Sequence, residues 1–215
     1  MPPFKPLNQH KSPLVFTLDH IRNTLDEHSP QFVTPKASTR QAAVAIILRE
    51  TMNGPQMLFI KRAEKDGDPW SGHMAFPGGH KDPVDDTLED AARRETLEEI
   101  NLDLSDSLYV GALDHQHAQP RGRKLDMLIA PHVFFIDGDP KFAPNYEVDE
   151  VVWTGLDPMT RNEIHDTETR PMMGTPTIFN GYRLERGHFV WGLTYRILKT
   201  FFTTLDPEWI GPKEL

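Results

Sequence analysis

Residues 76–102 read FPGGHKDPVDDTLEDAARRETLEEINL, and this segment carries the strongest structural signal in the chain. It starts with a Phe-Pro-Gly-Gly loop, whose glycines allow the backbone to approach a ligand closely. The charged and apolar residues that follow predict one helix over residues 86–100. Asp86 stands before this run and Glu89 lies three residues later, which resembles a capping box with Asp in the Ser or Thr place.

One face of the predicted helix changes character along its length. At about 100° per residue, a stripe that begins apolar ends in three carboxylates, the members being in order Leu88, Ala91, Ala92, Glu95, Glu98 and Glu99. Clustered carboxylates repel one another, and the helix macrodipole disfavours anions at this end. A divalent cation would offset both effects, because Mg²⁺ prefers carboxylate oxygens and also binds substrate phosphates. The alternative is a solvated acidic face held by i,i+4 ion pairs such as Arg94 with Glu98.

The segment from Gly79 to Leu102 resembles a Nudix box. The family pattern is Gly, five residues, Glu, seven residues, and then Arg-Glu-apolar-x-Glu-Glu-x-Gly-apolar. In this chain Arg94-Glu95, Glu98-Glu99 and Leu102 match it. The match after a Phe-Pro-Gly-Gly loop is specific, and it is the main reason to expect the family's fold and chemistry.

The chain departs from the family pattern at four places. The spacing from Gly79 to Arg94 is one residue longer, and Asp86 stands where the pattern has its first Glu. Thr96 occupies an apolar position, and Asn101 replaces the closing Gly but also tolerates left-handed backbone. The extra residue, within an Asp-Pro-x-Asp element at residues 82–85, is similar to the coenzyme A pyrophosphatase branch. Looser similarities to that branch extend over residues 40–202.

The resemblance implies an α+β fold, namely an α/β/α sandwich with a mixed β-sheet and a catalytic loop-helix-loop. It implies hydrolysis of a diphosphate linked to another moiety, with Mg²⁺ or Mn²⁺ as cofactor. Coenzyme A is the favoured substrate, with 3′,5′-ADP and 4′-phosphopantetheine as products. The alternatives are another Nudix substrate, such as ADP-ribose, a dinucleoside polyphosphate or a non-canonical nucleotide, and a non-catalytic Nudix-fold nucleotide-binding protein.

The resemblance also assigns roles to individual residues. The implied metal ligands are Glu95, Glu99, Glu98 and the carbonyl of Gly79, and Arg94 would orient the carboxylates. The general base is left open among Glu99, Glu147 and Glu150, and the last two also fit plain charges on an edge strand. The candidate substrate-binding residues are Lys61, Arg62 and Phe76, although a solvated strand end explains the two cations equally well.

Elsewhere the pattern predicts an amphipathic helix over residues 17–27, a hairpin over 42–60, a second hairpin over 177–189 about Asn180-Gly181, and a last helix over 190–202. The predicted organisation is an N-terminal extension at 1–40, a catalytic domain at 41–205 and a tail at 206–215. Trp191 is expected to be a core residue rather than a base-stacking platform. His115 and His117 are expected in a solvated loop, and the basic run at 121–124 is a candidate to hold a substrate's 3′-phosphate.

Composition limits the function classes further. The 215 residues include no cysteine, which excludes disulfides, zinc-thiolate sites and thiol nucleophiles. Lys and Arg number 23 against 32 Asp and Glu, so the net charge of −9 excludes nucleic-acid binding by bulk charge. No uncharged apolar run reaches the roughly 20 residues of a membrane span, and the N-terminus has no signal-peptide pattern. We therefore expect a cytoplasmic protein whose partner is a small nucleotide diphosphate, without a membrane, and leave a homodimer open.

Overall fold

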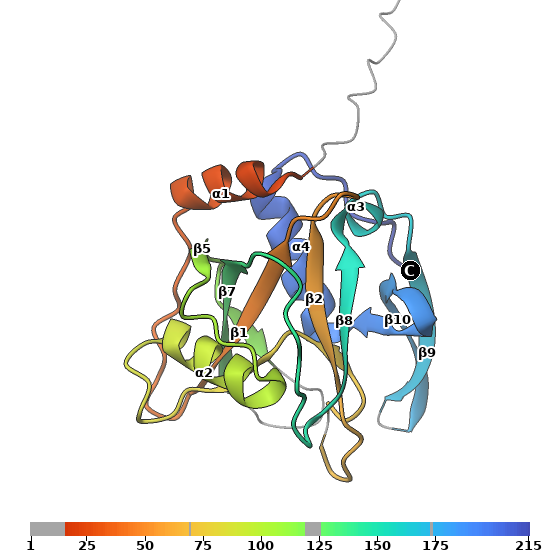
Figure 1. Ribbon diagram of the computed structural model, residues 1–215. Helices are drawn as coiled ribbons and strands as arrows, with labels where there is room; N and C mark the ends of the chain where they lie inside the picture. The colour runs from red at the N-terminus through yellow and green to blue at the C-terminus, as the bar shows by residue number, and fades with distance from the viewer. Residues whose placement is uncertain (1–15, 69, 119–125, 173) are drawn as a thin grey trace, which may run out of the picture.

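A computed structural model describes residues 16–68, 70–118, 126–172 and 174–215 (Figure 1). The main sheet contains β1 (Arg40–Arg49), β2 (Gln56–Arg62), β3 (Met74–Ala75), β4 (Gly78–His80), β5 (Leu108–Ala112), β6 (Gln116–Ala118), β7 (Met127–Phe135) and β8 (Val148–Gly155). A second sheet contains β9 (His165–Met172), β10 (Thr175–Arg183) and β11 (Phe189–Trp191). The α-helices are α1 (Leu18–Glu27), α2 (Leu88–Ile100), α3 (Leu156–Thr160) and α4 (Gly192–Leu205).

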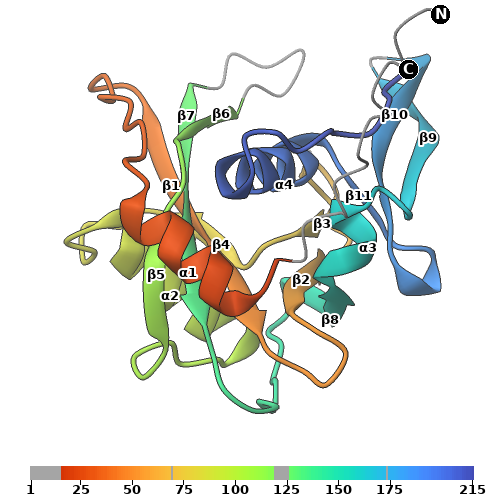
Figure 2. The ribbon, with the colours of Figure 1, turned by 90° about the horizontal axis from the view of Figure 1, so that it is seen from above.

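The main sheet is mixed. Its longest path runs β3-β2-β1-β7-β5, with β4 paired to β1, β6 to β7 and β8 to β2. The pairing of β1 with β7 is parallel and the other pairings of this sheet are antiparallel. In Figure 1, α2 lies in front of the sheet and α4 behind it, and Figure 2 shows α1 and α4 from above. The predicted α+β sandwich with a mixed sheet is therefore confirmed.

Strand β1 explains why helices cover both faces. Its side chains point alternately to opposite faces, and its interior positions are buried. Ile46 joins the cluster that contains residues of α1 and α4. Ile47 joins the cluster that contains Ala91 and Ala92 of α2. The predicted hairpin over 42–60 corresponds to β1 and β2, which pair at Leu48 and Met57.

Helix α2 begins later than the sequence pattern of residues 86–100 predicts. Thr87, not Asp86, is the N-cap, and its side chain accepts a hydrogen bond from the backbone N–H of Asp90. Asp90 bonds back to the N–H of Thr87 at 2.8 Å, which completes a capping box. The predicted box of Asp86 with Glu89 is therefore wrong by one residue. Asn101 ends the helix in the left-handed region, at φ 56° and ψ 37°, as its place in the pattern predicts.

The second predicted hairpin forms from β10 and β11, but its turn is not at Asn180-Gly181. Strand β10 runs straight through Asn180-Gly181 and pairs with β9 and β11 on its two sides. Gly181 is required because a Cβ there would lie less than 3.0 Å from the Val190 carbonyl and the Phe189 ring. The glycine thus reflects close packing of β11 rather than a turn.

The two ends of the described chain pack on the body. Helix α1 forms as predicted and buries Ile21 and Leu25. Beyond α4, the indole of Trp209 donates to the Thr160 carbonyl at 2.8 Å, and Glu214 accepts from Lys199 of α4. No described helix is both long and apolar enough to cross a membrane.

Candidate active site

Glu99 is the most deeply buried acidic side chain of α2. It lies in the last turn and is 2% exposed. Its carboxylate accepts a hydrogen bond from the backbone N–H of Gly78 at 2.9 Å, and its main-chain carbonyl accepts one from Asn145 at 2.9 Å. Gly78 belongs to β4, which pairs with β1, so the sheet fixes the loop against which the carboxylate packs.

The surroundings of Glu99 disfavour its charged form. Burial raises the pKa of the Glu99 carboxyl to about 8, and the nearby carboxylates of Glu95 and Glu147 push it in the same direction. The Gly78 N–H and the guanidinium of Arg62, 3.9 Å away, oppose this shift only in part. A buried acid with incomplete compensation is suited to a cation that binds beside it.

Glu95 lies one turn earlier and meets the neighbouring glycine. A Cβ on Gly79 would lie less than 3.0 Å from the Glu95 carboxyl group, so a larger residue there would displace the carboxylate. Burial also raises the pKa of Glu95, although the adjacent Arg94 opposes the shift. The structure thus brings Glu95 and Glu99 together against two consecutive glycines.

Glu98 does not join this pair. Its side chain is 56% exposed and bonds to Arg94 at 3.3 Å, the i,i+4 contact typical of a solvated helix face. Among the described residues, no three His, Cys, Asp or Glu side chains gather into a metal-binding group. The predicted acidic stripe therefore divides into one buried carboxylate, Glu99, one partly buried carboxylate, Glu95, and one exposed carboxylate, Glu98.

Arg94 connects the helix to the preceding loop. Its guanidinium binds both oxygens of Asp85 at 3.0 Å, the His80 carbonyl at 2.9 Å and Glu95 at 2.9 Å. The hydrogen bonds to Asp85 raise the pKa of Arg94, and they hold the pKa of Asp85 below its usual range. Arg94 thus holds the Glu95 carboxylate in position, and its predicted role in orienting metal ligands stays a prediction.

The partner of Arg94 is not the acid that the sequence match selects. Asp85 is 5% exposed, whereas Asp86 is exposed to solvent. The extra residue of the loop is absorbed in a turn in which Asp85 accepts from the Asp82 N–H at 2.7 Å. This turn points Asp85 inward, and Thr87 takes the capping role. The assignment of Asp86 as the first acid of the box is therefore corrected to Asp85.

Substitution of these adjacent acids provides a matched test. Asp85→Asn removes the charge from a buried two-point contact, so we expect a loss of about 2 kcal/mol in the free energy of unfolding. We expect kcat/KM to fall by about 10- to 100-fold, the usual cost of losing a residue that orients a ligand-bearing group. Asp86→Asn should change stability by less than about 0.5 kcal/mol. Urea unfolding and steady-state rates measure both, and equal effects at the two positions would contradict the assignment.

The two cations predicted to bind phosphate, Lys61 and Arg62, lie on opposite faces of the sheet. Arg62 lies on the α2 side, between Asp68 at 3.0 Å and Glu99. Lys61 is the preceding strand residue, so its side chain leaves the opposite face of the sheet, where it pairs with Asp149 at 2.5 Å. Phe76 is 3% exposed and stacks on Phe59 within the core, so its predicted role in substrate binding is wrong.

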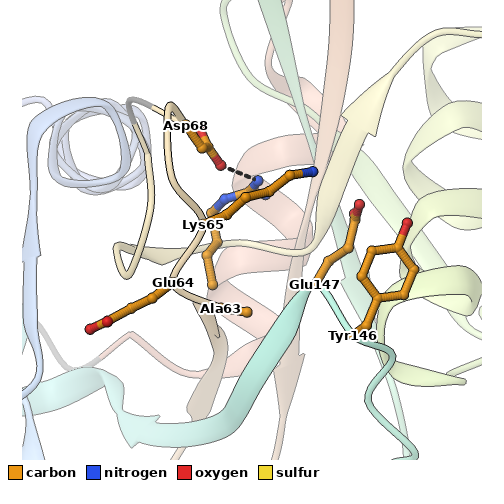
Figure 3. Close-up of a pocket in the computed structure, with 7 residues that line it drawn as sticks. Ala63, Glu64, Lys65, Asp68, Tyr146 and Glu147 are labelled. Carbon is orange, nitrogen blue, oxygen red and sulfur yellow. Dashed lines mark hydrogen bonds and ion pairs between the residues drawn. The ribbon is translucent and has the colours of Figure 1, made fainter.

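Glu147 and Glu150, the two candidate general bases outside α2, lie in different surroundings. Glu147, just before β8, lines a pocket together with Arg62 (Figure 3). Glu150 is held by Arg186 at 2.5 Å and by His188 at 3.0 Å, on the face of β8 away from α2. The structure therefore places Glu147 near Glu99 and does not bring Glu150 there.

Other sequence candidates lie outside this site. His115 contacts Phe32 and accepts from the Val33 N–H, and His117 is exposed on β6. Trp191 is partly buried among His73, Phe179 and Arg170 and belongs to neither core cluster, so the expectation of a core residue is only partly met. The basic run at 121–124 falls outside the described residues.

Three residues near the site were missed by the sequence reading: Asp85, Asp68 and Tyr146. Asp68 pairs with Arg62, and the Asp-Gly-Asp pattern around it predicts a turn rather than a site. Asn145, the residue before Tyr146, marks a turn into β8, and its carbonyl accepts a hydrogen bond from the Val148 N–H. No pattern in the sequence indicates that Tyr146 lines a pocket.

Residues 39–173 match the family model described as the NUDIX domain. The chain belongs to the Nudix family of hydrolases. This Nudix chain is 35% identical to the uncharacterized protein C14C4.10c of Schizosaccharomyces pombe over 130 aligned residues. The alignment covers 52% of this chain and 39% of that protein, so the match spans less than half the length of the relative.

Two further comparisons cover more of the Nudix chain. It is 28% identical over 186 residues to mitochondrial coenzyme A diphosphatase NUDT8 of Mus musculus, which covers 83% of the chain and 85% of the relative. The crystal structure of a MutT/nudix family protein from Enterococcus faecalis matches with a TM-score of 0.53 at 16% identity, over 90% of the chain and 76% of that protein. The last likeness concerns the fold alone.

Nudix hydrolases generally use divalent metal ions, and the two converging carboxylates of this site fit such an ion. Glu95 and Glu99 provide oxygen donors, and Glu99 is a buried carboxyl that lacks full charge compensation. Mg²⁺ usually keeps several waters and takes only one or two protein carboxylates besides substrate phosphates. Two carboxylates against a glycine backbone meet this requirement, so the absence of a third converging acid among the described residues is no obstacle.

Proposed function

We propose that this Nudix hydrolase cleaves the diphosphate bond of coenzyme A or a close derivative and releases 3′,5′-ADP and 4′-phosphopantetheine. The observation that carries the reaction type is the buried Glu99 carboxylate, packed against Gly78 beside Glu95. The relation to NUDT8 over most of both chains supports the choice of substrate. The Asp82–Asp85 element, which is similar to the coenzyme A pyrophosphatase branch, supports the same choice.

The proposal gives each residue of the site a task. Glu95 and Glu99, with the Gly79 carbonyl, would hold Mg²⁺ or Mn²⁺, which neutralises diphosphate charge and lowers the pKa of bound water. Arg94 keeps the Glu95 carboxylate in place. Arg62, which lies 3.9 Å from Glu99 and lines the pocket, would provide positive charge for a phosphate. Glu147 lines the pocket and is our candidate to accept the proton of the attacking water, because Glu99 is assigned to the metal.

The proposed substrate is tested by comparing kcat/KM for three candidate compounds. We expect kcat/KM for coenzyme A to exceed that for ADP-ribose, because the branch similarity and the named relative both point to coenzyme A. The values should be measured for coenzyme A, 3′-dephospho-coenzyme A and ADP-ribose under one metal condition. An advantage of about tenfold for ADP-ribose, about 1.4 kcal/mol of transition-state preference, would overturn the substrate and leave the family membership intact.

A further inference from the structure

A small pocket opens beside the buried Glu99. It holds about 190 Å³ and is lined by Arg62, Ala63, Glu64, Lys65, Asp68, Tyr146 and Glu147. Drug-sized ligands usually occupy about 300–1,000 Å³. This pocket therefore accommodates one compact part of a large diphosphate rather than the whole molecule. Arg62, which lines the pocket, lies 3.9 Å from Glu99. The portion of a ligand held in the pocket would therefore lie close to the Glu99 carboxylate.

Tyr146 combines a fixed backbone with a free ring. The preceding residue, Asn145, donates its N–H to the Glu99 carbonyl and accepts the Val148 N–H through its own carbonyl. The Asn145 side chain accepts from the Glu147 N–H at 2.8 Å. The Tyr146 residue is nevertheless 84% exposed, and within the described part of the chain it has neither a stacking partner nor a hydrogen bond.

An exposed aromatic residue is ordinary on a protein surface. Tyr146 differs because the hydrogen bond of its neighbour ties it to the catalytic helix and because it lines the pocket. Figure 3 shows Tyr146 and Glu147 side by side, with the Lys65 side chain extending toward them from the opposite wall. Because the backbone beside Tyr146 is held by hydrogen bonds, only the two side-chain torsions of the ring lose freedom when a ligand binds.

The charges of the pocket indicate how a ligand would lie. The wall opposite Tyr146 and Glu147 carries two cations, Arg62 and Lys65, together with Glu64 and with Asp68, which pairs with Arg62 at 3.0 Å. Phosphates would lie toward the cations, which leaves the ring for the uncharged, planar part of the molecule. Aromatic side chains bind nucleobases by stacking in this manner, since every base has a π-face.

We propose that Tyr146 stacks on the nucleobase of the diphosphate substrate and thereby contributes to the choice of substrate. This inference rests on the proposed function, since it assumes a nucleotide diphosphate. It adds a residue that neither the Nudix box nor the branch similarity includes.

The test is a cycle that removes the base and the ring separately. The ligands are 3′,5′-ADP and ribose 3,5-bisphosphate, which carry the same phosphates with and without adenine. Neither contains a diphosphate bond, so their dissociation constants can be measured by calorimetry in the presence of Mg²⁺. The proteins are the unmodified chain, Tyr146→Ala, Tyr146→Phe and Phe32→Ala. Phe32 is an exposed aromatic residue, 62% exposed, outside the lining of the pocket.

We expect the unmodified chain and Phe32→Ala to bind 3′,5′-ADP about tenfold more tightly than ribose 3,5-bisphosphate, in line with the strength of base–aromatic stacking. In Tyr146→Ala this preference should fall below about threefold, and Tyr146→Phe should recover it. Affinity for 4′-phosphopantetheine should be the same in all four proteins. An unchanged preference in Tyr146→Ala, an equal loss for both ribose ligands, or a loss for 4′-phosphopantetheine would each overturn the inference. Because this cycle needs no turnover, failure to hydrolyse coenzyme A would overturn the proposed function separately.

Discussion

Glu99→Gln is expected to lower kcat by about 100-fold or more while the fold is retained. Gln keeps the size of the side chain and an oxygen that can accept from the Gly78 N–H, but it lacks the charge that a cation requires. The Glu99 carboxylate is buried beside Glu95, so its replacement removes one of the two carboxylates assigned to the metal ion. Steady-state rates with saturating Mg²⁺, together with circular dichroism, measure the two parts of this expectation.

The same substitution should not destabilise the metal-free protein. Burial raises the pKa of Glu99 from its ordinary value of 4.5 to about 8, so the native state holds a proton in a range where the unfolded chain releases it. Wild-type stability therefore falls as pH rises from about 4.5 through about 8, and Glu99→Gln lacks this loss. At pH 9 without metal, Glu99→Gln should melt at the same temperature as the wild-type chain or at a higher one.

Glu98→Gln is the control for activity, because the exposed Glu98 side chain should affect turnover much less than Glu99 does. Wild-type turnover in Glu99→Gln would contradict the metal-ligand assignment.

Gly79→Ala should abolish most activity and leave the protein folded. The added methyl group would contact the Glu95 carboxyl group, which is the far end of a flexible side chain and can move. Moving it takes the carboxylate away from Glu99 and from Arg94, so we expect kcat/KM to fall by about 100-fold. The change in the free energy of unfolding should stay below about 1 kcal/mol. Activity assays and urea unfolding of the same preparation separate the two effects.

Gly78→Ala is the matched contrast one residue earlier. Gly78 has φ near +150°, and a Cβ there would lie less than 3.0 Å from the backbone of Ala43 and Val44 in β1. The backbone of a central strand cannot yield, so we expect a loss of more than about 3 kcal/mol in the free energy of unfolding. If Gly79→Ala unfolds the protein and Gly78→Ala does not, the described packing of β4 against β1 and Glu95 is wrong.

The sequence predicted the features that depend on local periodicity. The pattern of residues 86–100 predicted α2, and the apolar runs on either side of Asn53-Gly54 predicted the hairpin of β1 and β2. These predictions succeed because the spacing of apolar residues reflects which face each element buries. The pairing of Glu95 with Glu99 follows from the same helical geometry.

The failures arise where tertiary contacts decide the role of a residue. The sequence could not show that one extra loop residue turns Asp85 rather than Asp86 toward Arg94. It could not show that Phe76 packs on Phe59, because the strand that determines its direction, β3, has only two residues. Strand β9 was missed because its polar sequence, His165–Met172, has no apolar alternation to mark it.

Glu150 shows the same limit for the general base. Both Glu147 and Glu150 come before or within a predicted strand, and the sequence alone gives them equal standing. The pairing of Lys61 with Glu150 across β2 and β8 places Glu150 on the far face, where Arg186 and His188 bind it. Only the register of the sheet separates the two acids.

The most direct test of the proposed chemistry is identification of the products formed from coenzyme A. Purified protein should be incubated with coenzyme A and Mg²⁺ or Mn²⁺, and the products separated and identified by mass. We expect 3′,5′-ADP and 4′-phosphopantetheine in equal amounts, with no products when a chelator removes the metal or when Glu99→Gln replaces the wild-type chain. Intact coenzyme A after incubation with active, metal-loaded protein, or equal cleavage by Glu99→Gln, would contradict the account.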